Sequence, residues 1–74
     1  MKTPEAILEK IEELKTLGFT VDIKEKENFV FLCWKSENSW STGVIEDEIS
    51  MQSISNRLQN DIDVLKSAPH ENNS

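Results

Sequence analysis

Residues 29–35 read Phe29-Val30-Phe31-Leu32-Cys33-Trp34-Lys35 and form the longest apolar run in this 74-residue chain. Almost every side chain in the run is aromatic or branched. Such a composition predicts a β-strand that is buried on both faces. The segments before and after this central strand are therefore expected to supply the elements that cover it.

An amphipathic helix is expected near the start of the chain. The sequence Thr3-Pro4-Glu5 favours a helix start, with Thr3 as the cap and Pro4 at the first helical position. Gly18 offers the left-handed conformation that commonly ends a helix. The apolar positions between these signals follow helical spacing and are Ile7, Leu8, Ile11, Leu14 and Leu17.

A half-buried strand is expected over residues 19–24, where apolar and polar side chains alternate. The side chains that should point inward are Phe19, Val21 and Ile23. The polar segment 25–28 has the composition of a turn, so this strand should pair antiparallel with the central strand.

A third, weaker strand is expected over residues 40–45, after a turn at 36–39. A second interpretation remains open, because Val44, Ile45 and Ile49 also fit a helix that begins earlier.

A second amphipathic helix is expected to follow, with either Asp47 or Ser50 as its cap. Its apolar positions step by three and four and are Met51, Ile54, Leu58, Ile62 and Leu65. The sequence Ser67-Ala68-Pro69 should end the helix. We therefore expect one domain over residues 1–67 and a disordered C-terminal tail over residues 68–74.

The expected order is helix, strand, strand, strand, helix. Both helices are amphipathic and need an apolar surface, and the sheet is the one available. The sequence thus predicts an α+β fold of two layers, in which a three-stranded antiparallel sheet packs against two helices. A helix on each face of the sheet is the alternative, and it would leave a plain monomer.

The side of the sheet that the helices cover follows from the length of the first hairpin loop. An even loop places Val30, Leu32 and Trp34 on the same side as the inward residues of the first strand. A two-residue loop at Glu37-Asn38 would add Gly43 to that side, where its missing side chain lets a helix approach closely. An odd first loop would exchange the two sides.

The opposite side, which we call the spare face, is then left without a cover. Its candidate interface residues are Phe29, Phe31, Cys33, Trp40 and Val44. Thr20, Asp22, Lys24 and Thr42 lie beside them as polar neighbours. Large contiguous apolar patches on a protein surface tend to mark interaction sites, so we expect a protein interface here.

The overall charge disfavours two classes of partner. The chain has 14 acidic and 8 basic residues, and its formal net charge is −6. Binding to nucleic acid requires clustered Lys and Arg, and anionic membrane surfaces also attract basic segments. We therefore expect neither a nucleic-acid partner nor a membrane partner.

The residues that usually carry chemistry are scarce. Cys33 is the only cysteine and His70 is the only histidine, so neither an intrachain disulfide nor a Cys/His zinc site is expected. Both glycines are isolated, which argues against a phosphate-binding loop. The run Glu46-Asp47-Glu48 lacks the spacing of a calcium loop. We expect no catalytic residues, no metal, no cofactor and no enzymatic activity.

A cytoplasmic location is expected. The sequence shows no apolar signal segment, and no apolar run approaches the roughly 20 residues of a membrane span. A single unpaired cysteine suits a reducing compartment.

Two functional hypotheses follow. The first is a small non-enzymatic protein that binds another protein, as a homodimer formed through the spare face. The alternative is an acidic mimic of nucleic acid that occupies a basic groove on an enzyme or repressor. Double-stranded-RNA-binding domains share the expected order of elements, but they bind phosphates through a basic patch. Over positions 51–57, at the start of the second helix here, Arg57 is the only basic residue, so this patch is not present.

Overall fold

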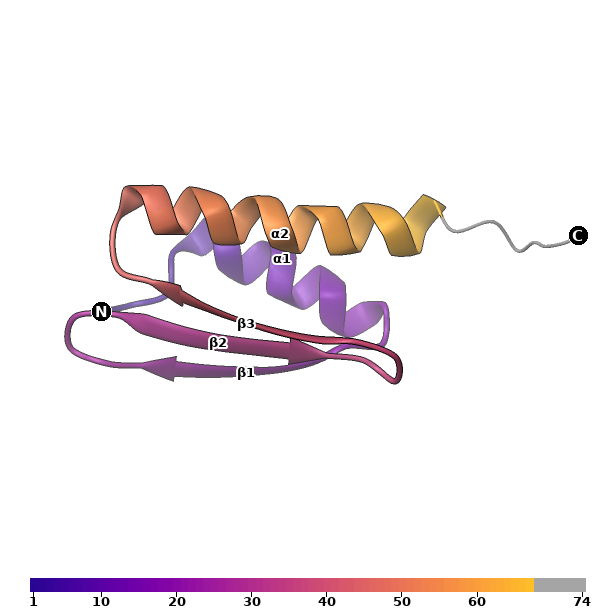
Figure 1. Cartoon of the computed structure of the whole chain (residues 1–74), viewed down its shortest axis with the longest axis horizontal. Helices are drawn as coiled ribbons and strands as arrows, with labels where there is room; N and C mark the ends of the chain where they lie inside the picture. The colour runs from indigo at the N-terminus through magenta and orange to yellow at the C-terminus, as the bar shows by residue number, and fades with distance from the viewer. Residues whose placement is uncertain (68–74) are drawn as a thin grey trace, which may run out of the picture.

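The computed structural model describes residues 1–67, which form two helices and one three-stranded antiparallel sheet (Figure 1). The elements are α1 (Glu5–Thr16), β1 (Thr20–Glu25), β2 (Val30–Lys35), β3 (Trp40–Ile45) and α2 (Glu48–Ser67). The α+β class and the order of elements are therefore confirmed. The tail expected over residues 68–74 lies outside the described residues.

Both helices lie on one side of the sheet, and they run in the same direction (Figure 1). This arrangement follows from three antiparallel strands, which return the chain to the end at which the first helix began. Besides the apolar core, two polar contacts join the helices within residues 1–67: Lys10 donates to Gln59, and Lys66 forms an ion pair with Glu13 at 2.6 Å. The fold thus has two layers, and the alternative with a helix on each face is wrong.

The start of α1 differs from the expectation. Pro4, with φ −60° and ψ 148°, is the N-cap, and no side chain caps the helix. Thr3 is buried instead, where its backbone N–H and hydroxyl donate to the Glu25 carboxylate at 2.9 and 2.8 Å. The predicted Thr3 cap is therefore wrong, because the end of β1 offers Thr3 a charged acceptor.

The end of α1 is a Schellman motif, which confirms the expected role of Gly18. This glycine has a φ of 103° and donates its N–H to the carbonyl of Lys15 at 3.1 Å. The next N–H, of Phe19, reaches back to the carbonyl of Leu14 at 3.0 Å. The motif brings Phe19 into the core and sets the direction in which β1 begins.

The start of α2 uses both candidate caps. Asp47 Oδ1 accepts the backbone N–H of Ser50 at 2.8 Å, and Ser50 Oγ accepts the N–H of Asp47 at 2.9 Å. This reciprocal pair is a capping box. It stops the helix from extending backward, so residues 40–45 remain a strand and the early-helix alternative is wrong.

The strand register confirms the even first loop. Ile23 pairs with Leu32, and Leu32 pairs with Gly43. The side chains of β2 that point to the helices are consequently those expected, and Val30, Leu32 and Trp34 are 1% exposed or less. The core that they share with the helices also contains Ile7, Ile11, Leu14, Phe19, Ile45, Ile54, Leu58 and Ile62. Leu8 and Leu65, expected on the same helical stripes, lie at the margin and are each 37% exposed.

Candidate protein interface

The spare face is defined by the side chains of β2 that point away from the helices. Phe31 and Cys33 alternate with the buried residues of β2, and both are half-buried although no element among residues 1–67 lies over them (Figure 1). Leu32, between them, has no exposed surface. The contrast within one strand shows that the helices cover one side of β2 and leave the other side partly exposed to solvent.

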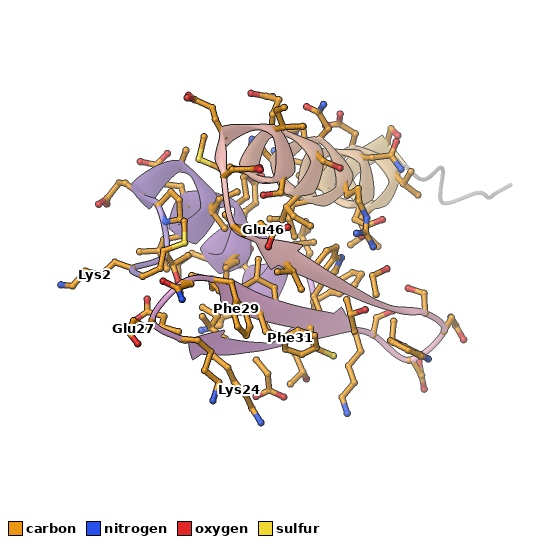
Figure 2. All side chains as sticks on the ribbon, turned by 60° about the vertical axis from the view of Figure 1, so that its left-hand side comes forward. Lys2, Lys24, Glu27, Phe29, Phe31 and Glu46 are labelled. Atoms are coloured by element: carbon orange, nitrogen blue, oxygen red, sulfur yellow. The ribbon has the colours of Figure 1, made fainter. Side chains whose placement is uncertain are left out.

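The five expected interface residues lie together on this face. Phe29 directly precedes β2 and is half-buried, while Trp40 and Val44 on β3 are 69% and 40% exposed. Phe31 pairs with Val44 across the β2–β3 ladder and with Lys24 across the β1–β2 ladder. Figure 2 shows Lys24 projecting away from the helices on this side of the sheet. The register thus forms one row of Lys24, Phe31 and Val44 across the spare face.

The charges on the spare face differ from those of the chain as a whole. Asp22 and Lys24 of β1 and Lys35 of β2 alternate onto this side. The face therefore carries one acidic and two basic residues, whereas the whole chain carries 14 acidic and 8 basic residues. A face of mixed charge with an apolar centre lacks the excess of acidic residues that would make two copies repel strongly at this surface.

A second cluster, between α2 and the sheet, was not expected from the sequence. Trp34 is 1% exposed, and its Nε1–H donates to Asp61 Oδ2 at 2.7 Å. The guanidinium of Arg57 lies 5.1 Å from the centre of the same ring, which is a cation–π distance. The i, i+4 spacing of Arg57 and Asp61 was the available signal, but nothing local indicated that Trp34 would reach them.

A shallow groove of about 310 Å³ lies beside this cluster, between α2 and β3. The residues that line it are all of polar or charged type and are Ser41, Asn56, Arg57, Asn60 and Asp61. One cation and one carboxylate face the same small space, so the groove has both donors and acceptors.

The groups with shifted pKa values have structural partners. The backbone N–H of Thr3, and then its hydroxyl, hold the pKa of Glu25 below its usual value. The N–H and hydroxyl of Ser50 likewise lower the pKa of Asp47. The hydrogen bond to Glu13 raises the pKa of Lys66. None of these three groups points onto the spare face, and each shift is explained by a helix end or an interhelical contact.

Two kinds of feature are absent from the described part of the chain. Residues 1–67 contain no group of three or more His, Cys, Asp or Glu side chains placed to hold a metal ion. In the same residues, neither helix combines the length and the apolar character that crossing a membrane requires.

No protein-family model, curated protein or solved structure matches this chain.

Proposed function

We propose that this protein acts by binding another protein chain, and that it does so as a homodimer formed through the spare face. The observation that supports this function is the asymmetry of β2. Its helix-facing side chains are fully buried, while Phe31 and Cys33 and their neighbour Phe29 retain exposed surface on the opposite side. The proposal is a binding function without catalysis.

The driving force is the removal of apolar surface from water. Burial contributes roughly 25 cal/mol for each Å² of apolar surface. The exposed indole of Trp40 and the half-buried rings of Phe29 and Phe31 are the largest contributors available on this face. Aromatic side chains are also the residue type that interface cores favour.

A second copy is the proposed partner because the face is self-complementary. A two-fold interface requires one patch to fit itself. Asp22 and Lys24 lie two residues apart on β1. A copy rotated about a two-fold axis can place Asp22 of each chain opposite Lys24 of the other. Most of the acidic residues lie elsewhere, so their repulsion acts at longer range and is screened by salt.

The test uses two adjacent residues of β2. Phe31→Glu places a charge at the centre of the spare face, and an unpaired charge in an apolar interface is strongly unfavourable. The variant should remain folded by circular dichroism and should have half the wild-type mass in sedimentation at micromolar concentration. The matched control is Leu32→Glu, which places the same charge in the helix-covered core and should unfold the chain.

Each other outcome has a clear meaning. A folded Phe31→Glu variant with the wild-type mass would show that the spare face is not the interface. A wild-type protein that sediments as a single 8.5 kDa chain at all concentrations would contradict self-association altogether. An unfolded Phe31→Glu variant would contradict the assignment of Phe31 to a surface that is free within one chain.

The acidic mimic of nucleic acid is the competing proposal. Glu5, Glu9 and Glu12 are all exposed on α1, on the layer opposite the spare face. Binding through such charges weakens steeply as salt screens them, whereas an apolar interface tolerates salt. Association of the chain that persists unchanged between low and high salt therefore favours the spare face.

A further inference from the structure

The outer edge of β3 has unpaired backbone groups. Within residues 1–67, β3 pairs only with β2. The N–H of Ser36 donates to the carbonyl of Ser39 at 2.7 Å, so this pair closes the hairpin as a hydrogen-bonded pair. Antiparallel ladders alternate, and the N–H and C=O groups of Ser41, Gly43 and Ile45 therefore point to β2. Those of Trp40, Thr42 and Val44 point to the open edge.

The two edges of the sheet are not equivalent. The other edge strand, β1, contains Asp22, Lys24 and Glu25, and charged side chains discourage pairing with another chain. The sequence of β3 is WSTGVI, which has no charged residue and no proline. Of the two edges, β3 thus lacks the features that keep an edge strand from pairing.

The groove beside β3 suits a copy of itself. Ser41, Asn56 and Asn60 provide donors and acceptors, and Arg57 and Asp61 provide opposite charges one turn apart on α2. A two-fold axis at the β3 edge would bring two α2 helices side by side in opposite directions. The side of α2 that carries Arg57 in one copy would then face the side that carries Asp61 in the other copy.

We propose that β3 pairs antiparallel with β3 of a second copy, about a two-fold axis at Thr42. In this register Thr42 faces its own counterpart, and Trp40 faces Val44 of the other copy. Trp40, Thr42 and Val44 of both copies direct their backbone groups to the open edge, so each of these N–H groups can donate to a carbonyl of the other copy. Aromatic and β-branched side chains opposite each other also stabilise antiparallel pairs. The proposal rests on the proposed function in its choice of partner, which is a second copy of this chain.

The size of the spare face explains why edge pairing would strengthen the contact between faces. Three six-residue strands cover an outline of about 20 by 14 Å, or about 300 Å². Stable interfaces bury about 800 Å² of accessible surface on each partner. Edge pairing joins two spare faces into one six-stranded face of twice the area, and two such faces stack to give a four-chain assembly with closed symmetry.

Four proteins separate the edge contact from the face contact in sedimentation. Thr42→Pro removes an N–H that is not bonded to β2, and proline is tolerated on edge strands. The wild type should have four times the mass of one chain. Thr42→Pro and Phe31→Glu should each have twice the mass of one chain, and the double variant should have the mass of a single chain. Thr42→Ala trims the same side chain but keeps the N–H, so it should retain the wild-type mass.

Failure of edge pairing and failure of face stacking predict different sets of masses. If the edge does not pair but the faces do, the wild type and Thr42→Pro are both two-chain species and Phe31→Glu is a single chain. If the faces do not stack but the edges pair, the wild type and Phe31→Glu are both two-chain species and Thr42→Pro is a single chain. The first pattern overturns edge pairing, and the second overturns the proposed function while supporting edge pairing.

Amide hydrogen exchange gives a test that requires no proline. In the Phe31→Glu variant, the N–H groups of Thr42 and Val44 should exchange slowly at high concentration and quickly after dilution. The N–H of Gly43, which points to β2, should be protected at both concentrations and serves as the control. Fast exchange at Thr42 at high concentration would overturn the proposal.

Discussion

Gly43 of β3 and Ile54 of α2 are in such close contact that a Cβ on Gly43 would overlap the Cδ1 atom of Ile54. The absent side chain is what allows α2 to lie directly on β3. Ile54 is 3% exposed and fills the space that any larger residue would require.

Gly43→Ala should therefore destabilise the fold by about 1–3 kcal/mol, the usual cost of overpacking. The second variant, Ile54→Val, removes the Cδ1 atom with which the new methyl group collides. The double variant should lose less stability than the sum of the two single losses, as measured by urea denaturation. Additive losses would show that the overlap is relieved elsewhere.

Ile11→Ala and Leu58→Ala should each lower the free energy of unfolding by about 2–5 kcal/mol. Both side chains have no exposed surface and lie at the centres of the stripes that α1 and α2 present to the core. Val64→Ala is the control on α2, because Val64 is 58% exposed and its loss should cost less than about 0.5 kcal/mol. Similar losses at Leu58 and Val64 would contradict the orientation of α2.

Asp61→Ala should cost about 1–3 kcal/mol, because it removes the acceptor of the buried Trp34 Nε1–H. Asp61→Asn keeps a carbonyl oxygen at that position and should retain most of the stability. In a Trp34→Phe background, which has no indole N–H, the alanine change should cost much less. An equal cost in both backgrounds would show that Asp61 stabilises the fold in another way.

Stability should fall as the pH is lowered below about 4. The pKa values of Glu25 and Asp47 are lowered in the fold, so the unfolded chain takes up protons first. Their contribution to the free energy of unfolding is complete above the pKa values that these groups have in the unfolded chain. It is lost as the pH falls through the lower pKa values of the folded chain. Asp47→Asn preserves the cap without the titration, so its melting temperature should depend less on pH than that of the wild type as the pH falls from about 6 to about 3. An unchanged dependence would contradict the role of Asp47.

Local patterns were sufficient for the order of the elements and for the inward side of each strand. Helical spacing identified Ile7, Ile11 and Leu14, which the core contains. Alternation identified Phe19, also a core residue, together with Val21 and Ile23, which are partly buried and pack against the core. The register followed from the even hairpin loop, since a side-chain period of two leaves no intermediate solution. The candidate interface residues of the spare face were placed by the same argument, and their role as an interface stays a prediction.

The helix ends were harder to predict because several residues compete for the same role. Thr3 has the composition of a cap, yet the Glu25 carboxylate, 22 positions later, binds both its N–H and its hydroxyl. Asp47 and Ser50 were alternatives in the sequence and are partners in the structure.

Periodicity along the chain was therefore enough to establish which side of each helix and strand is apolar, because burial repeats with the geometry of the backbone. Packing in three dimensions was needed to place both helices on one side of the sheet and to bring Asp61 to Trp34, 27 positions away. It also left β3 as an edge strand with its outward N–H groups unpaired within residues 1–67. These relationships join groups far apart in the chain, and the energies that select them come from close packing and hydrogen bonds that no short window of residues contains.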